Sequence, residues 1–597
     1  MALVVSKRKE TLPEIKNLVE VDYEEMIPLT SCEAALAEGA PAIHEKGNIL
    51  SHEHLVRGNA EEVLANSAFI VTEHYSVPIN EHAFMEPECA IAQPEGEGIL
   101  LFSAGQSIYD EQREVARMLG LDKEKIHVQS KLVGGGFGGK EDMSVQHHAS
   151  LAAWLLKKPV KVLLSREESL MVHPKRHGME MDFTTGCDEE GNLTAMKAVI
   201  YADTGAYASL GGPVLQRACT HAAGPYKYQT IDVEGFAVYT NNLPAGAFRG
   251  FGVCQTAFAI ESNLNLLAEK VGLSPWEIRF KNSVAPGDTL PNGQLVSKNA
   301  ALKEALLAVK DVYEQAEVAG ISSFFKNSGV GVGLPDTGRC IISVEEGKIH
   351  VRTSAACIGQ GMATVTTQIA CETLNLPPEM IVAEAPDTRR TPNSGTTTAS
   401  RQSLFTGEAT RRAAMQLRYE LDMGRALSDL EGEEFYGEYS AKTDPLINDK
   451  KSPVSHAGYG YAAEVAILDD KGKVAKFVAA YDMGQVVNPR AAEGQIEGGI
   501  AMGMGYALTE KFALEEGYVK AKYATLGLVN ATQVPPIETI LVYADNLHEG
   551  LAYGIKGVGE LATIPTAPAL AGAYFALDGQ LRPSLPLENT PYQKKKR

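Results

Sequence analysis

The chain has 597 residues, and its 55 lysines and arginines against 75 aspartates and glutamates give a formal net charge of −20 at pH 7. This acidic balance argues against nucleic acid as a partner, because phosphate backbones attract basic surfaces. No run of about 18 apolar residues occurs, so no segment is predicted to span a membrane. A chain of this length is expected to form several domains with large cores.

Eight cysteines are scattered along the chain, without a CxxC motif or any tighter cluster. Zinc and iron–sulfur sites use closely spaced cysteines, and disulfide frameworks are typical of short secreted chains. The first residues also lack the order of charged and apolar segments found in a signal peptide. We therefore expect reduced thiols in a cytoplasmic protein.

Two short patterns typical of strands lie near the start of the chain. Residues 2–6, ALVVS, resemble a buried strand, and residues 18–23, LVEVDY, alternate between apolar and polar side chains. Nothing precedes them in the sequence with which they could pair.

A run of glycines within residues 130–142, SKLVGGGFGGKED, is the most informative local pattern. It contains Gly136, Phe137 and Gly138 and precedes residues 140–157, where apolar side chains recur with helical spacing. Glycine lets backbone N–H groups approach a ligand closely, and a helix start attracts anions. Alone the pattern is weak, since tight turns before helices are common, and the Lys-Ser/Thr ending of a P-loop is missing.

Four further turns of small or polar residues follow this glycine run, and we refer to all of them as the five small-residue turns. The additional turns are at residues 245–252 (AGAFRGFG), 358–361 (IGQG), 392–400 (PNSGTTTAS) and 556–560 (KGVGE). Donor-rich turns at five places predict one large anionic ligand held mainly by backbone amides.

The remaining sequence alternates between predicted hairpins and helices. Hairpins are predicted at residues 179–201, 340–354 and 462–481, and helices at residues 255–271, 411–427, 490–508 and 565–577. The segment 490–508 contains five glycines, each of which weakens a helix by about 1 kcal/mol, so we expect neighbours to pack very closely against it. Residues 429–453 are interpreted as an irregular surface connection.

The motifs GGGFGGKE, AFRGFG, GQG, PNSGTTTAS, NP…GQIEGG and KGVGE occur in this order. Together they resemble the molybdenum-binding chain of the xanthine dehydrogenase and aldehyde oxidase family of molybdenum hydroxylases, over residues 82–568. The resemblance implies an α+β fold, with a molybdopterin-binding domain in two α/β halves at residues 31–320 and 321–597. Residues 1–30 would be the C-terminal part of an α/β-hammerhead domain, completed by a partner or by an upstream segment that a truncation has removed.

In this family such turns wrap a molybdopterin-type cofactor, sometimes in its cytosine dinucleotide form, whose dithiolene holds molybdenum. The resemblance assigns cofactor binding to Gln106, Gly136, Phe137, Gly138, Arg249, Gln360, Thr398, Ala399, Ser400 and Gln495. Of these, Gln106, Phe137 and Arg249 would surround the metal without being its ligands. Because the chain lacks iron–sulfur motifs, [2Fe–2S] clusters and FAD are expected on partner subunits of an oligomer, or on a missing segment.

Glu560, the last residue of KGVGE, resembles the general base of the family, which takes a proton from the oxygen that is added to the substrate. A carboxylate after a glycine turn is also often only a residue that favours a helix start. The resemblance therefore carries the catalytic assignment.

Glu141, Arg217 and Phe251 stand where purine-oxidising members carry a glutamate, an arginine and a stacking phenylalanine. An arginine can stabilise charge on a purine ring, and a glutamate can bond its polar edge. Each residue also has a plainer interpretation, as a surface glutamate, a solvated arginine or a core phenylalanine. The second wall of the substrate pocket, expected near residues 324–335, has no secure assignment.

The sequence thus favours hydroxylation of a purine of the xanthine or hypoxanthine type at a ring carbon, with oxygen from water. Hydroxylation of another N-heterocycle or of an aldehyde stays open. A truncated, non-catalytic fragment is the alternative from a different class.

Overall fold

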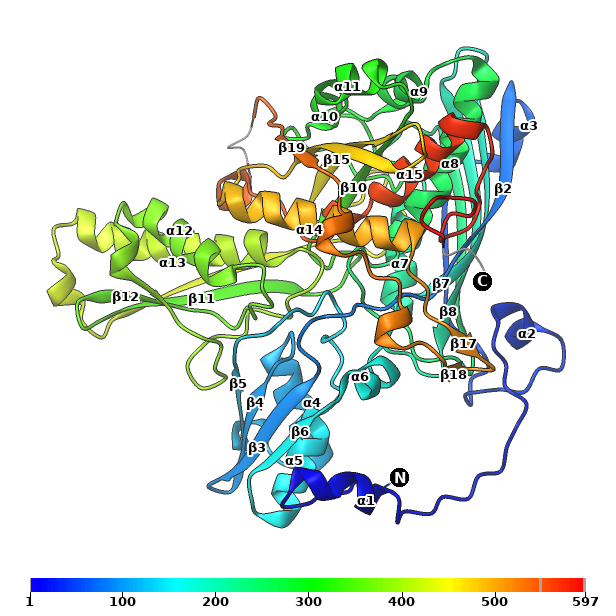
Figure 1. Ribbon diagram of the computed structural model, residues 1–597. Coiled ribbons are helices and arrows are strands. Elements are labelled where there is room, and N and C mark those ends of the chain that lie inside the picture. The colour runs from blue at the N-terminus through cyan, green and yellow to red at the C-terminus, as the bar shows by residue number, and fades with distance from the viewer. Residues whose placement is uncertain (1, 547–549, 594–597) are drawn as a thin grey trace.

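The structure is a computed structural model that describes residues 2–546 and 550–593. Its strands form five sheets, and helices pack against them, which confirms the expected α+β fold (Figure 1). In the described part of the chain, no sheet combines strands from before and after residue 318. The sheets therefore fall into two halves, while the exact domain boundaries stay predictions.

The first half contains a five-stranded sheet and a four-stranded sheet. The larger sheet has the order β1-β9-β8-β7-β2, formed by β1 (Ile49–Arg57), β2 (Phe69–Val77), β7 (Gly178–Cys187), β8 (Leu193–Gly205) and β9 (Thr230–Tyr239). The smaller sheet has the order β5-β4-β3-β6, formed by β3 (Cys89–Glu95), β4 (Gly98–Ser103), β5 (Ile126–Ser130) and β6 (Val160–Leu163). The antiparallel pair β7 and β8 confirms the predicted hairpin at residues 179–201.

The second half contains two four-stranded sheets and a two-stranded ribbon. One sheet has the order β10-β15-β16-β19, formed by β10 (Ala319–Ser328), β15 (Gly458–Leu468), β16 (Val474–Asp482) and β19 (Ile537–Leu541). The other has the order β13-β12-β11-β14, formed by β11 (Asp336–Glu345), β12 (Lys348–Arg352), β13 (Ile381–Ala383) and β14 (Glu434–Ala441). The ribbon pairs β17 (Leu514–Glu515) with β18 (Tyr518–Val519). Both predicted hairpins of this half are confirmed.

The helices that matter for the site follow small-residue turns or pack behind them. They are α5 (Gln146–Leu156), α7 (Gly211–His221), α8 (Val253–Val271), α12 (Met362–Leu374), α13 (Gln402–Asp422), α14 (Pro489–Leu508) and α15 (Thr566–Asp578). Helix α5 begins at Gln146 and not near residue 140, because the N–H groups of Gly139 and Glu141 close tight turns onto the carbonyls of Gly136 and Gly138. Helix α13 lies along β11 and β14 in an arm at the left of Figure 1.

Helix α14 tests the expectation of very close packing at its glycines. A methyl group on Gly499 or Gly503 would lie 2.5 or 2.6 Å from Ala562 or Thr566, and one on Gly505 would lie 2.1 Å from Glu510. At Gly494 and Gly498 no neighbouring atom lies within 4 Å, so the expectation is wrong for these two. The close side of α14 faces the segment that joins the 556–560 turn to α15.

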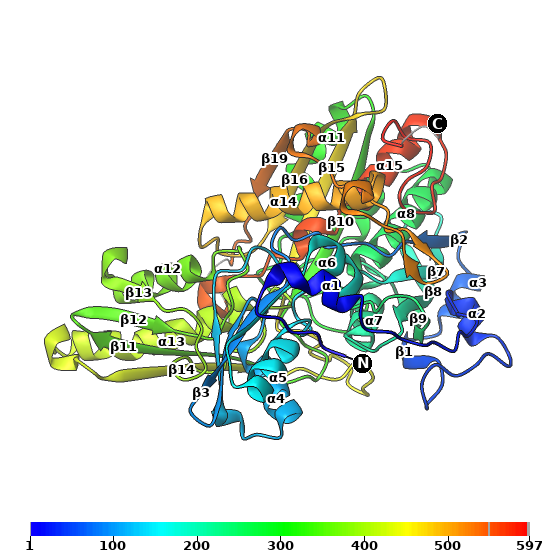
Figure 2. The same cartoon turned by 60° about the horizontal axis from the view of Figure 1, so that its bottom comes forward.

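Two strand predictions at the N-terminus are wrong. Residues 2–6 and 18–23 form no strand, and Leu18, Val21 and Tyr23 are 79%, 56% and 81% exposed. The alternating residues 18–23 have no strand edge with which to pair, and they lie in the segment that runs along the surface from α1 (Leu12–Lys16) to α2 (Cys32–Leu36) (Figures 1 and 2). The hammerhead assignment of residues 1–30 stays a prediction.

The acidic stretch 429–453 is not wholly irregular, because it contains β14, which pairs with β11. In β14, Phe435 and Gly437 are buried and their direct neighbours are exposed, which is the pattern of a half-buried strand. The acidic residues on the exposed side made this segment resemble an irregular connection in the sequence.

All eight cysteines are free thiols. Among the described helices, none combines the length and the apolar character that crossing a bilayer requires.

Candidate active site

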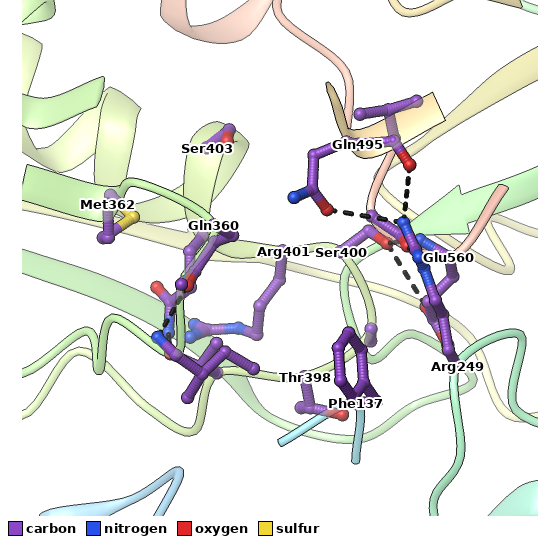
Figure 3. Close-up of a pocket in the computed structure, with 18 of the residues that line it drawn as sticks. Phe137, Arg249, Gln360, Met362, Thr398, Ser400, Arg401, Ser403, Gln495 and Glu560 are labelled. Atoms are coloured by element: carbon purple, nitrogen blue, oxygen red, sulfur yellow. Dashed lines mark hydrogen bonds between the residues drawn. The ribbon is translucent and has the colours of Figure 1, made fainter. Parts of the chain in front are cut away.

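A cavity of about 570 Å³ lies where the five small-residue turns converge, between the two halves of the chain. Its size is typical of sites for cofactors and small ligands. The predicted site residues that line it are Gln106, Phe137, Gly138, Glu141, Arg249, Phe251, Gln360, Thr398, Ala399, Ser400, Gln495 and Glu560. Figure 3 labels Phe137, Arg249, Gln360, Thr398, Ser400, Gln495 and Glu560 among them. Gly136 and Arg217 do not line it.

Four lining residues other than glycine have a left-handed backbone. Their φ angles are 52° at Phe137, 49° at Phe251, and 48° at both Ala399 and Ser400. This conformation is costly for residues with a side chain, and it concentrates at functional sites where the surroundings enforce it. The turns are therefore built to direct backbone toward the cavity.

Two helix starts supply donors to the cavity. Neither α12 nor α13 has a side-chain cap, and their first residues, Met362, Gln402 and Ser403, line the cavity. The first N–H groups of a helix have no intrahelical partner and attract anions. At Gly359 and Gly361 no atom lies within 4 Å of where a side chain would start, so a ligand can approach the backbone. This donor set fits a phosphate-bearing pterin.

Gln106 joins two of the turns. Its Nε2 donates to the carbonyl of Thr397 at 2.7 Å, and its Oε1 accepts the N–H of Gly138 at 3.1 Å. A methyl group on Gly136 would lie 2.5 Å from that Oε1, so Gly136 serves the site by letting Gln106 approach. Nε2 carries a second hydrogen that remains available for a ligand.

Arg249 joins three of the elements around the cavity. Its Nη2 donates to the carbonyl of Gln495 at 2.8 Å (Figure 3). Its Nε donates to the carbonyl of Gly559, and its backbone N–H donates to the carbonyl of Phe137 at 2.8 Å. Burial lowers the pKa of Arg249 to about 10, so the guanidinium stays charged at neutral pH. A fixed positive charge thus lies beside the 556–560 turn.

Gln360 fixes the conformation of its own turn, because its Oε1 accepts the N–H of Ile358 at 2.7 Å and its Nε2 donates to the carbonyl of Ala356 at 3.1 Å.

Arg401, which was not predicted as a site residue, fixes the conformation of the 392–400 turn. It pairs with Asp336 at 2.6 Å and donates to the carbonyl of Ser394 at 2.5 Å. The only signal for it in the sequence is its position directly after PNSGTTTAS.

Glu560 is 8% exposed and is held from two sides. Its N–H donates to Ser400 Oγ at 3.0 Å, and the same hydroxyl donates to its Oε2 at 3.4 Å (Figure 3). On the other side, Lys326 Nζ lies 3.3 Å from Oε2. Lys326 belongs to β10, in the region where the sequence allowed no secure assignment, and a single lysine among small and apolar residues was its only signal.

The three predicted substrate residues are not all at the cavity. Glu141 lines it next to the Thr398 hydroxyl, and burial raises the pKa of the Glu141 carboxyl well above its usual range. Phe251 also lines the cavity. Arg217 is 2% exposed and lies behind the wall, where it donates to the carbonyl of Val330. Burial lowers its pKa to about 10, so the solvated interpretation of Arg217 is wrong.

Comparison with known protein families shows to which family the chain belongs. Models of the molybdopterin cofactor-binding domain match residues 43–283 and residues 297–433 and 426–535, most of the chain. The chain belongs to the xanthine dehydrogenase and aldehyde oxidase family of molybdenum hydroxylases. As a member it is an enzyme subunit that binds molybdenum through a molybdopterin cofactor, and the small-residue turns and uncapped helices fit that group.

Several relatives of this molybdenum hydroxylase are known. A probable xanthine dehydrogenase subunit of Bacillus subtilis is 33% identical, over 96% of this chain and 83% of the relative. The nicotinate dehydrogenase large molybdopterin subunit of Eubacterium barkeri is 37% identical, over 54% of this chain and 75% of the relative. The solved structure of aldehyde oxidoreductase from Desulfovibrio gigas superposes with a TM-score of 0.90 at 27% identity, over 97% of this chain and 67% of that one.

Proposed function

We propose that this molybdenum hydroxylase subunit oxidises a purine of the xanthine or hypoxanthine type, adding oxygen from water to a ring carbon. The observation that carries the proposal is the half-buried Glu141 carboxyl on the cavity wall, whose pKa is raised by desolvation, together with Phe251 on the same lining. The likeness to the Bacillus subtilis protein named as a probable xanthine dehydrogenase supports it.

Glu141 would recognise the polar edge of the ring. Its raised pKa favours the neutral acid, which donates one hydrogen bond and accepts another. A purine edge offers neighbouring acceptor and donor atoms that match this pair, and Thr398 would orient the carboxyl. Phe251 would stack on the ring face.

Glu560 would act as general base. When bound, the molybdenum cofactor supplies the oxygen atom to be transferred and takes up two electrons from the substrate. Glu560 accepts the proton that this oxygen loses. Because Lys326 and Ser400 engage Oε2, Oε1 is the atom that would receive the proton.

The cofactor would be held by the residues assigned to it on the cavity wall, with Gln106 and Arg249 nearest the metal. Arg217 would act from behind the wall, as a buried positive charge that favours negative charge on the purine ring. Its Nη1 has no hydrogen-bond partner among the described residues.

Electrons would leave through an iron–sulfur subunit and an FAD subunit. The eight free cysteines are dispersed, and no group of metal-binding geometry in the described residues contains a cysteine. We expect the isolated chain, free of iron and flavin, not to reduce NAD⁺ with xanthine, and the added partner subunits to restore it. Sustained NAD⁺ reduction by the chain alone would contradict the proposal that electrons leave through partner subunits.

Another N-heterocycle is the second candidate, because the nicotinate dehydrogenase subunit is 37% identical over half of the chain. Steady-state kcat/KM values for xanthine, hypoxanthine, nicotinate and an aromatic aldehyde, measured with an artificial electron acceptor, separate the candidates. We expect a purine to have the highest value. A preference for nicotinate or the aldehyde would reject the purine assignment and leave the family unchanged.

A further inference from the structure

Lys326 is a buried charge at the centre of the enzyme. It lies near the end of β10, whose ten residues are all buried, and its side chain is 1% exposed. An ammonium group removed from water is costly unless a partner compensates for it. Burial lowers the pKa of Lys326, and the nearby Glu560 carboxylate opposes that change.

The partner of Lys326 is the carboxylate assigned as the base. Nζ lies 3.3 Å from Glu560 Oε2 and 2.5 Å from Asn327 Oδ1. Two residues later in β10, Ser328 Oγ accepts the N–H of Gly557 at 2.8 Å. Strand β10 therefore holds the 556–560 turn at both of its ends.

Other charged groups also act on Glu560 but are bonded elsewhere. Arg217 on α7 donates to Val330, and Arg249 donates to Gly559 and Gln495. Glu141 is the neighbouring acid, and the charge of Glu560 adds to the burial that raises the pKa of the Glu141 carboxyl. Cys254 on α8 is buried nearby, where burial raises the pKa of its thiol. Among the described residues, Lys326 is the one that forms an ion pair with Glu560.

We propose that Lys326 is a positioning residue for the base: it keeps the buried Glu560 carboxylate ionised and fixes Oε2, so that Oε1 is free to take the proton. The inference rests on the proposed role of Glu560. Lys326 itself touches neither cofactor nor substrate, because it is absent from the cavity wall.

Charge, and not only packing, is what this role requires. Lys326→Met keeps the length of the side chain and removes the charge, Lys326→Gln is a second neutral variant, and Lys326→Arg keeps the charge. In kcat/KM against pH, the acidic limb reports ionisation of the base in the free enzyme. We expect it to move to higher pH by about one unit or more in the neutral variants, since a nearby opposite charge shifts a carboxyl by roughly that amount. Lys326→Arg should stay close to the parent enzyme.

A second readout does not depend on turnover. In cofactor-free protein, infrared titration detects protonated carboxyl groups, and the band that disappears in Glu560→Gln belongs to Glu560. We expect this band to persist to higher pH in Lys326→Met than in the parent. As a matched control, Lys175→Met removes another buried lysine, 2.9 Å from Glu81, and should leave the Glu560 band unmoved.

The outcomes are distinct. An unchanged Glu560 band in folded Lys326→Met or Lys326→Gln, with the acidic limb also unmoved, would overturn the proposal. An active Glu560→Gln enzyme would reject the base assignment instead, whatever the infrared result. Both neutral variants could fail to fold while Lys326→Arg folds. In that case, a Glu560 band that moves in Lys326→Arg by the shift expected for loss of the charge would also reject the positioning role.

Discussion

At the residue scale, the site depends on a small number of carboxylates and arginines whose surroundings set their charge. Glu560 and Glu141 lie on the same cavity, yet their environments differ. Glu560 pairs with Lys326 and accepts a hydrogen bond from the hydroxyl of Ser400, so both contacts engage its Oε2. Burial raises the pKa of Glu141, which favours the neutral form of a recognition group.

The substitution Glu560→Gln should lower kcat/KM by roughly 10²–10⁴-fold, because it removes the base and keeps the shape of the side chain. Molybdenum and pterin contents should equal those of the parent, since the change leaves the small-residue turns intact. Steady-state kinetics together with metal analysis measure both. A variant that keeps more than about a tenth of the activity would exclude Glu560 as the general base.

The substitution Arg217→Met should lower purine oxidation and spare the oxidation of uncharged aromatic aldehydes. Arg217 would stabilise negative charge on the ring from behind the wall, without a direct contact, so its loss should lower kcat/KM for purines by about tenfold or more, which corresponds to about 1.4 kcal/mol or more. The buried Arg217 also donates to Val330, so melting temperature and cofactor content must accompany the kinetics. Equal losses on both substrate types would show that Arg217 is only structural.

Most residues on the cavity wall could be predicted because each belongs to a contiguous motif. Gln360, Ser400 and Glu560 are examples whose turns are readable in the sequence. The roles of Lys326, which lies behind the wall, and of Arg401, which is part of it, could not be predicted. Their partners Glu560 and Asp336 lie far away along the chain. Only the three-dimensional fold brings such charges together.

At the scale of elements, helix α14 shows that some glycines of a helix allow close packing while others have open space beside them. Its two adjacent glycines, Gly498 and Gly499, face opposite conditions: open space at the first and Ala562 at the second. The glycine pattern could be recognised in the sequence, but it does not tell which positions have a neighbour. The start of α5 shows the same limit, because the turns at Gly136 and Gly138 delay it.

Adding the same methyl group at these two positions should have opposite effects. Gly498→Ala should stabilise the protein by about 0.5–1 kcal/mol, because alanine favours the helix. Gly499→Ala should destabilise it by about 1–3 kcal/mol, because the new methyl would lie 2.5 Å from Ala562. Denaturant unfolding of matched preparations measures both changes. A gain in stability at Gly499 would show that α14 is not tightly packed there.

At the scale of the whole molecule, the two halves meet around one cavity, and buried acids are distributed through both. Burial raises the pKa of Glu111 and of Glu510 to about 7 and that of Glu464 to about 8. Glu464 lies inside the sheet on β15 and accepts a hydrogen bond from Thr566 at 3.2 Å. In the folded protein these groups hold their protons near neutral pH, unlike in the unfolded chain.

The stability of the protein should therefore fall as pH rises toward 8. For Glu464 the contribution is complete below its ordinary pKa of 4.5 and is lost as pH rises through the folded value of about 8. Melting temperatures between about pH 6 and about pH 8 should decline, and Glu464→Gln should decline less steeply because glutamine does not titrate. Identical slopes for the parent and Glu464→Gln would contradict protonation of this buried acid.

The fold class and the cofactor could be predicted at this scale, because the ordered motifs span most of the chain. The structure of residues 18–23 could not be predicted, since their alternation indicates a potential to pair as a strand and not the presence of a partner edge. Substrate choice is likewise not contained in any one motif. It depends on how Glu141, Phe251 and the buried Arg217 are arranged around the cavity.

The most direct test of the proposed function follows the oxygen atom. Cofactor-loaded protein is incubated with xanthine or hypoxanthine, an artificial electron acceptor and water labelled with heavy oxygen, and the product is analysed by mass spectrometry. We predict a purine that has gained one oxygen atom carrying the label of the water, and no such product with Glu560→Gln. Conversion of nicotinate or an aldehyde without any labelled purine would contradict the proposed function.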